Sequence, residues 1–180
     1  MEYGAEQRRK IGGLGGFLQN PDFTLLKIDL VAVGTRPPLW VVQAIEQYRS
    51  RMKRDCRFEV REIKTSDRNK RQPVAINKEY EAKLLGNHLD SSARVIAMDS
   101  RGKSWSTGQL ARKVEVWSQQ TNHFQFVIGG PDGLADVVLN RADEVWSLSN
   151  LTFPHFLVRV LLAEQIYRAL MLNANHPYHR

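Results

Sequence analysis

The chain has 180 residues, of which 42% are hydrophobic and 25% charged, with a single cysteine and a formal net charge of +7. This length is typical of one domain, and the composition excludes a wholly disordered or fibrous chain. The lone Cys56 excludes an intrachain disulfide and a cysteine-based metal cluster, and no run of about 20 apolar residues could span a bilayer. We therefore expect one domain in the cytoplasm, with no metal and no membrane contact.

The positive charge is concentrated in one part of the chain. Between Arg49 and Lys83 there are twelve Lys/Arg residues against six Asp/Glu, which leaves +6 of the total +7 in this stretch. A local basic excess can hold a polyanion through phosphate contacts, so an RNA or DNA partner is one interpretation. A solvated basic surface is the other, and no known nucleic-acid-binding motif decides between them.

Residues 1–25 differ from the rest of the chain. Glycines interrupt their only apolar stretch, and Glu2 and Glu6 lie where a secretion signal would be positive, which argues against a signal peptide. We interpret this segment as a flexible extension, and residues 26–180 as one domain.

From residue 26 onward the hydrophobic pattern alternates between short strands and helices. Apolar runs predict strands and 3.6-residue periodicity predicts helices. The strands are expected at 28–33, 58–63, 94–98, 124–128 and 144–147, and the helices at 37–52, 74–89, 107–119, in the few residues before 142, and at 154–172. The 58–63 run alternates apolar and charged residues, as an edge strand would. This order predicts an α/β fold, with a mainly parallel sheet and helices on both faces.

The loop Gly129-Gly130-Pro131-Asp132-Gly133-Leu134 follows a strongly apolar strand. Ligands of open α/β sheets bind beyond the carboxyl ends of strands, and glycines let a ligand approach the main chain closely. The loop lacks the features of a phosphate cradle, and Asp132 would repel an anion. It therefore indicates a neutral or cationic ligand, with a plain tight turn as the alternative.

The last helix carries apolar residues at nearly every angle, among them Leu157, Val160, Leu161, Ile166, Tyr167 and Leu170. Such a helix has to be buried on more than one side, which predicts a homodimer. Glu164 and Arg168 have the spacing of an ordinary ion pair.

Two further groups of residues are candidates for chemistry. His155 and Arg159 share one edge of the last helix directly after a loop, which favours a functional role. The ending Tyr178-His179-Arg180 is aromatic and basic, as suits RNA, although terminal residues often fray.

Three segments together resemble one family. They are the glycine loop IGGPDGL, the run from Trp146 to His155 (WSLSNLTFPH), and the ending from Leu157 (LVRVL) through EQIYR to NHPYHR. They are similar to the pseudouridine N3-methyltransferases of the ribosomal large subunit (RlmH) in the SPOUT superfamily. The resemblance extends from about Lys27 to Arg180.

The resemblance implies an α/β fold with a C-terminal trefoil knot and a homodimer that packs at the knot. It also implies that S-adenosylmethionine is held mostly by main-chain groups of three loops. Carried over to this chain, the cofactor-binding residues are Met98, Gly129, Leu148, Ser149, Asn150, Leu151, Thr152 and Phe153.

The substrate that the resemblance implies is a pseudouridine of 23S rRNA in the assembled ribosome, methylated at N3. The reaction needs loss of an imide proton and in-line attack on a sulfonium methyl group. We hypothesise that a histidine accepts the proton and an arginine stabilises the anion. The candidate catalytic residues are His155, Arg159, Tyr178, His179 and Arg180.

Two departures from the family stand out. Phe156 stands where the family commonly has a proline. Leu26 falls where the initiator methionine of the family usually lies, so we hypothesise that residues 1–25 are a start-site artefact. One rival function is a non-catalytic ribosome-binding factor with the same fold. Another is an enzyme of phosphorylated metabolites, which would need anion-binding loops that we do not find.

Overall fold

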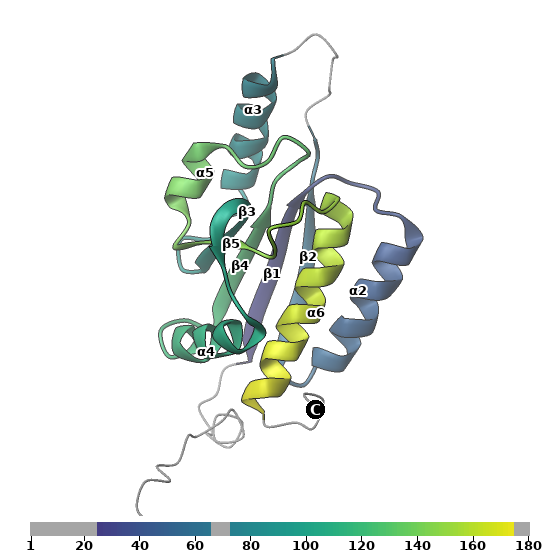
Figure 1. The fold of residues 1–180 in the computed structure, drawn as a ribbon, viewed down its shortest axis with the longest axis vertical. Coiled ribbons are helices and arrows are strands. Elements are labelled where there is room, and N and C mark those ends of the chain that lie inside the picture. The colour runs from purple at the N-terminus through teal and green to yellow at the C-terminus, as the bar shows by residue number, and fades with distance from the viewer. Residues whose placement is uncertain (1–24, 66–72, 175–180) are drawn as a thin grey trace, which may run out of the picture.

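The computed structural model describes residues 25–65 and 73–174 and contains one five-stranded sheet (Figure 1). The spatial order of the strands is β2-β1-β4-β3-β5, and each neighbouring pair is parallel. The strands are β1 (Leu26–Val33), β2 (Cys56–Ile63), β3 (Arg94–Ser104), β4 (His123–Ile128) and β5 (Glu144–Ser147). The parallel α/β prediction is confirmed, and β2 is an edge strand as its alternating pattern indicates.

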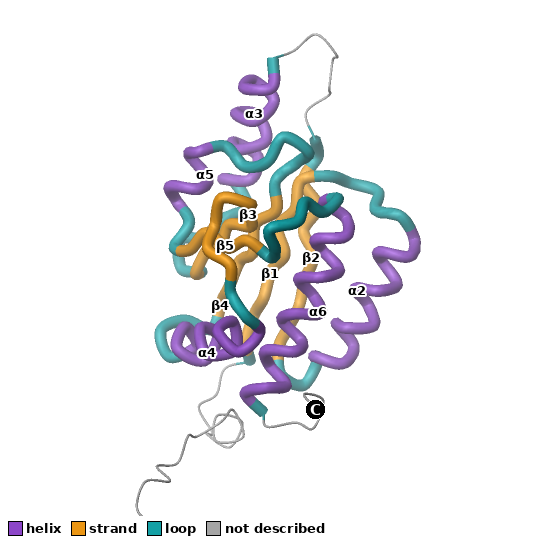
Figure 2. The backbone as a smooth tube through the Cα atoms, in the orientation of Figure 1, coloured by secondary structure: helices purple, strands orange, loops and turns teal. Residues whose placement is uncertain are grey.

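Helices cover both faces of the sheet (Figure 2). On one face lie α2 (Leu39–Met52), α4 (Thr107–Ser118) and α6 (His155–Asn173), and on the other α3 (Val74–Gly86) and α5 (Asp136–Arg141). Because side chains alternate along a strand, Ile28 and Leu30 of β1 pack toward α6, whereas Val31 and Val33 pack toward α3. Two apolar cores therefore enclose the central strands.

Local signals explain where the helices begin. The Ser106 hydroxyl accepts a hydrogen bond from the backbone N–H of Gln109, and the Gln109 side chain accepts one from the backbone N–H of Ser106, which is a capping box. Helices α2, α3 and α6 each follow a proline at the N-cap position, which holds the chain extended before the first turn.

Strand β3 differs from its predicted length. It was expected to end at residue 98 but continues to Ser104, and it pairs with β5 in two separate runs, so that Trp146 faces both Met98 and Lys103. The residues between these runs are polar or glycine, and they do not show the apolar pattern of a strand. Gly102 permits the close approach, since a Cβ there would lie 2.6 Å from the carbonyl oxygen of Val145. Helix α3 also ends earlier than expected, at Gly86.

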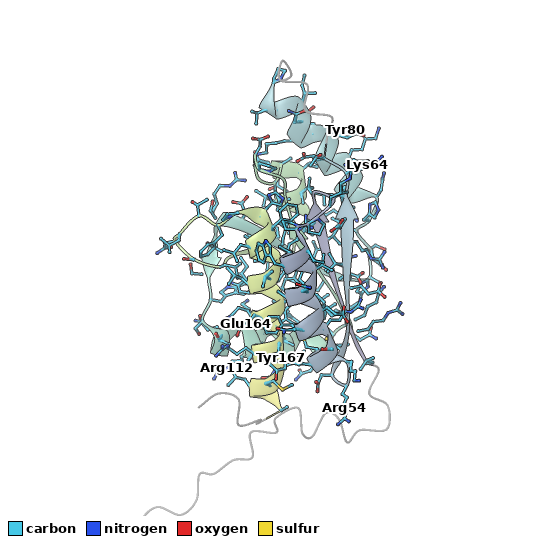
Figure 3. All side chains as sticks on the ribbon, turned by 90° about the vertical axis from the view of Figure 1, so that its right-hand side faces the viewer. Arg54, Lys64, Tyr80, Arg112, Glu164 and Tyr167 are labelled. Atoms are coloured by element: carbon cyan, nitrogen blue, oxygen red, sulfur yellow. The ribbon has the colours of Figure 1, made fainter. Side chains whose placement is uncertain are left out.

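Helices α2 and α6 lie side by side, and no other described helix covers them from the viewing side of Figure 3. The ion pair between Arg168 and Glu164 on α6 is confirmed at 2.6 Å.

None of the helices in the described ranges is long and apolar enough to cross a membrane. The knot and the domain boundary at residue 26 stay predictions.

Candidate functional site

Three loops at the carboxyl edge of the sheet surround a cavity of about 410 Å³. The first is the irregular stretch 99–102 within β3, where the pairing with β5 is interrupted, and the other two follow β4 and β5. The first residues of α6 close one side. This volume is within the range of about 300–1,000 Å³ that small-molecule sites occupy. The residues predicted for cofactor binding that line it are Met98, Gly129, Leu148, Ser149, Leu151, Thr152 and Phe153. The predicted convergence of the three loops is therefore present, although Asn150 is exposed and does not line the cavity.

Gly129 and Gly130 of the glycine loop lie too close to their neighbours to carry a side chain, Gly129 to main chain and Gly130 to the Glu81 carboxylate. A Cβ on Gly129 would lie 2.7 Å from the carbonyl carbon of Gly133, and one on Gly130 would lie 2.6 Å from a carboxylate oxygen of Glu81. The backbone N–H of Gly133 donates to the carbonyl of Gly130 at 2.9 Å, which closes a tight turn around Pro131 and Asp132. At Gly129, Gly130 and Gly133 the wall of the cavity therefore consists of main-chain groups.

Serine side chains fix the loop that follows β5. The Ser147 hydroxyl donates to the carbonyl of Ser149 at 2.9 Å, and the backbone N–H of Leu151 donates to the Ser149 hydroxyl at 2.9 Å. Local bonds of this kind hold a loop without a regular ladder. The loop thus keeps a defined shape while Leu151 remains exposed.

Two charged residues of the irregular stretch within β3, Asp99 and Arg101, also line the cavity, and the sequence analysis missed them. Asp99 receives hydrogen bonds from the backbone and the side chain of Arg101, each at 2.9 Å. Burial alone would raise the pKa of Asp99, but these bonds outweigh burial and hold the pKa below its usual range. A carboxylate therefore faces the cavity together with Lys78 and Asp132. The position of Asp99 directly after Met98, where the apolar strand pattern of the sequence ends, was the signal that could have identified it.

His155 begins α6 and lines the same cavity. It is half-buried, and its ring centroid lies 4.1 Å from that of Phe156. A Cβ on Gly34, which follows β1 with a φ of 112°, would lie 3.2 Å from His155 Nε2 and 3.0 Å from Arg159 Nη2. The absent side chain at Gly34 lets both residues of α6 approach the end of β1.

Arg159 is completely buried, with 0% exposure. Its Nη2 donates to the carbonyls of Val33 at 3.0 Å and Gly34 at 2.8 Å, while Nη1 donates to a carboxylate oxygen of Glu62 at 3.2 Å. Burial lowers the pKa of Arg159, and Glu62 opposes that shift. The guanidinium also lies 4.7 Å from the centroid of the Phe156 ring, so the residue that departs from the family pattern contributes to this environment.

These contacts give Arg159 a definite place beside the cavity but not in its lining. Its bonds join α6 to the carboxyl ends of β1 and β2. Because His155 lies on the same helix, these bonds also fix the position of His155 relative to the sheet. The other predicted catalytic residues, Tyr178, His179 and Arg180, lie outside the described residues.

A parallel α/β sheet with a backbone-lined pocket at its carboxyl edge defines the class of open-sheet proteins that bind a small ligand there. Residues 26–179 match the family described as "Predicted SPOUT methyltransferase", and the chain belongs to this family of methyltransferases. The resemblance found in the sequence is confirmed.

Curated relatives cover the same part of the chain. A protein of Marinomonas sp. (strain MWYL1), named Ribosomal RNA large subunit methyltransferase H, is 46% identical over 86% of this chain and 100% of its own length. Proteins with the same name from Thioalkalivibrio sulfidiphilus and Burkholderia mallei (strain SAVP1) are 43% and 42% identical, each over 86% of this chain and 99% of their own.

Solved structures share the fold at low identity. A probable methylase family protein from Haemophilus influenzae Rd KW20 superposes with a TM-score of 0.52 at 13% identity, covering 87% of this chain and 72% of its own. A probable methyltransferase from Bordetella pertussis Tohama I gives a TM-score of 0.53 at 14% identity, covering 81% and 95%.

Proposed function

We propose that this protein is an S-adenosylmethionine-dependent methyltransferase that methylates N3 of a pseudouridine in 23S rRNA of the assembled ribosome. The observation that carries the proposal is that the three segments line one common cavity, in a chain of the SPOUT methyltransferase family. The names of the curated relatives support rRNA as the substrate class.

The residues around the cavity fit the proposed cofactor. The glycine loop offers main-chain groups at Gly129, where a Cβ could not be accommodated. The ionised Asp99, paired with Arg101, and Asp132 line the cavity beside Lys78, so the lining is balanced in formal charge and is not an anion site. When bound, S-adenosylmethionine supplies the sulfonium methyl group. The chain's own contribution is to fix the donor between the glycine loop and residues 148–153.

We propose His155 as the proton acceptor, either alone or together with His179. Nitrogen N3 of pseudouridine carries an imide proton that has to leave before or during attack, and a half-buried imidazole at the rim of the cavity can accept it. Arg159, which donates to the carbonyls of Val33 and Gly34, acts in this proposal by holding His155 in place. Tyr178 and Arg180 are proposed to contact the base or its phosphate.

The proposal also includes a homodimer and a cytoplasmic location. The apolar residues of α6 that the monomer leaves half-exposed, such as Leu157, Val160 and Leu161, support a second copy as their cover. The ribosome as substrate implies the cytoplasm.

Methyl transfer to ribosomes tests the function directly. Ribosomes from a strain that lacks the gene, radiolabelled S-adenosylmethionine and the purified protein should give one labelled nucleotide in 23S rRNA. His155→Gln should lower kcat at least about a hundred-fold while cofactor affinity changes little, because general acid–base catalysis contributes about 10²–10⁴. Cofactor binding without any methyl transfer would contradict the proposed substrate. Ribosome binding without cofactor binding would favour the non-catalytic factor.

A further inference from the structure

Arg36 has an unusual backbone conformation in the loop between β1 and α2. Its φ is 61°, and within residues 25–65 and 73–174 it is the one non-glycine residue with a positive φ. It also precedes Pro37, and a residue before proline normally takes an extended conformation with a negative φ. A bulky side chain in this region is strained, and such strain persists where the surroundings impose it.

The contacts of Arg159 help to impose this backbone conformation on Arg36. Arg159 Nη2 donates to the carbonyls of Val33 and Gly34 immediately before the loop, and Glu62 holds Nη1 from β2. Pro37 and Pro38 stiffen the other end of the loop, and Pro38 is the N-cap residue of α2. Arg36 is therefore held between a buried anchor and a rigid helix start.

Contacts with other described residues do not account for the placement of the Arg36 side chain. It is exposed, and it makes no hydrogen bond or ion pair with any other residue that the structure describes. The loop leaves the carboxyl edge of the sheet and passes the start of α6 (Figures 1 and 2). Because Gly34 packs against both His155 and Arg159, the loop that carries Arg36 starts beside the rim of the cavity.

We propose that Arg36 binds a phosphate of the rRNA substrate next to the target nucleotide. This inference rests on the proposed function. Methylation at N3 takes place on the pairing edge of the base, so the target nucleotide has to be unpaired and its backbone has to be held in place. A guanidinium presents several N–H donors in a fixed plane, which suits a phosphate, and a rigid loop lowers the entropy lost on binding.

A second copy of the chain is the competing occupant of this surface. Leu39 and Trp40 follow the loop and are 72% and 51% exposed, so an apolar contact between copies could cover them. An apolar contact between copies would not use the Arg36 guanidinium, which is exposed and forms no hydrogen bond or ion pair within residues 25–65 and 73–174. We therefore assign the phosphate, and the oligomeric state becomes one of the measurements.

The test compares Arg36→Gln and Arg36→Gly with Arg54→Gln in the full chain, on ribosomes that lack the modification. Arg54 is a matched control because it is also exposed but lies at the other end of the sheet. Figure 3 shows this separation, since Lys64 marks the carboxyl end of β2, the edge where the Arg36 loop starts, and Arg54 lies at the opposite end. We expect both Arg36 variants to raise KM for ribosomes about ten-fold, as loss of a charged hydrogen bond implies. The slope of log affinity against log salt should fall by about one phosphate contact.

Three controls separate the explanations. Cofactor affinity, measured by calorimetry, should not change in any variant, and Arg36→Gly should raise the melting temperature because it relieves the positive φ. Equal KM and salt slope in wild type, Arg36→Gln and Arg54→Gln would overturn the inference while leaving the function intact. A change of oligomeric state in Arg36→Gln would overturn it in favour of a contact between copies. Absence of methyl transfer by the wild type would instead overturn the proposed function.

Discussion

At the scale of single residues, Arg159 shows how a functional prediction and a structural role can coincide. Its guanidinium satisfies two carbonyls at the end of β1 and the carboxylate of Glu62, yet it lies one helical turn from His155. Arg159→Ala should lower the free energy of unfolding by about 3 kcal/mol, because it leaves a partner carboxylate and buried carbonyls unpaired. Urea unfolding checks this value. A loss below about 1 kcal/mol would contradict the anchoring role.

The cysteine gives a second prediction at this scale. Burial, with a smaller contribution from Asp55, raises the pKa of Cys56 to about 12. The thiol should therefore resist iodoacetamide at pH 8.5 in the folded protein and react readily in urea. Because the folded pKa is raised, this group destabilises the fold only as pH rises above 9. Cys56→Ala should remove that alkaline loss, and rapid labelling of the native thiol would contradict the burial.

At the scale of elements, the glycine loop is the most sensitive part of the cavity. Gly129→Ala should weaken binding of S-adenosylmethionine at least ten-fold, because a Cβ would lie 2.7 Å from the Gly133 carbonyl carbon and displace the wall. Gly108→Ala in α4 is the matched control, since its Cβ would meet only the Ser106 hydroxyl oxygen, at 4.0 Å. Isothermal calorimetry compares the two. Equal affinities would show that the loop does not bind the cofactor.

The elements also show what sequence patterns can predict. Strands β1 and β4 and helices α2 and α6 follow from apolar periodicity, because one or both of their faces are buried. The extension of β3 does not follow, since its residues are polar and pair with β5 only because Gly102 allows close contact.

Long-range contacts set the limit for the site. The glycine loop and residues 148–153 were predictable because strand ends of a parallel sheet share one edge. The bond between Arg159 and Glu62 joins residues 97 positions apart, and no local pattern indicates it. Asp99 and Arg101 were missed because a short acid-base pair after an apolar run in the sequence is also typical of a solvated turn.

At the scale of the whole molecule, the basic stretch proves to be spread out. Arg54 and Lys64 lie near opposite ends of β2 (Figure 3), and several basic residues between Arg49 and Lys64 pair with acids, among them Arg49 with Glu46 and Arg61 with Asp29. The part of the basic stretch that the structure describes, 49–65 and 73–83, is therefore not one compact site. The choice between an RNA-binding and a solvated surface depends on the binding experiments.

The proposed dimer gives a prediction for the assembly. Leu161→Glu places a charge on the half-exposed side of α6 and should halve the mass measured by light scattering, because an unpaired charge at an apolar interface opposes association. Val137→Glu is the control, since Val137 is 66% exposed on α5 at the other face of the sheet. A wild type that is already monomeric, or an unchanged mass for Leu161→Glu, would contradict the dimer.

The most direct test of the whole account is a crystal structure of the full chain grown with S-adenosylmethionine. We predict that the donor lies between the glycine loop and residues 148–153, bonded mainly to main-chain groups, with its methyl group toward His155. Density for the donor at any other place, or an empty cavity at saturating concentration, would contradict the claim that these three loops form the methyl-donor site.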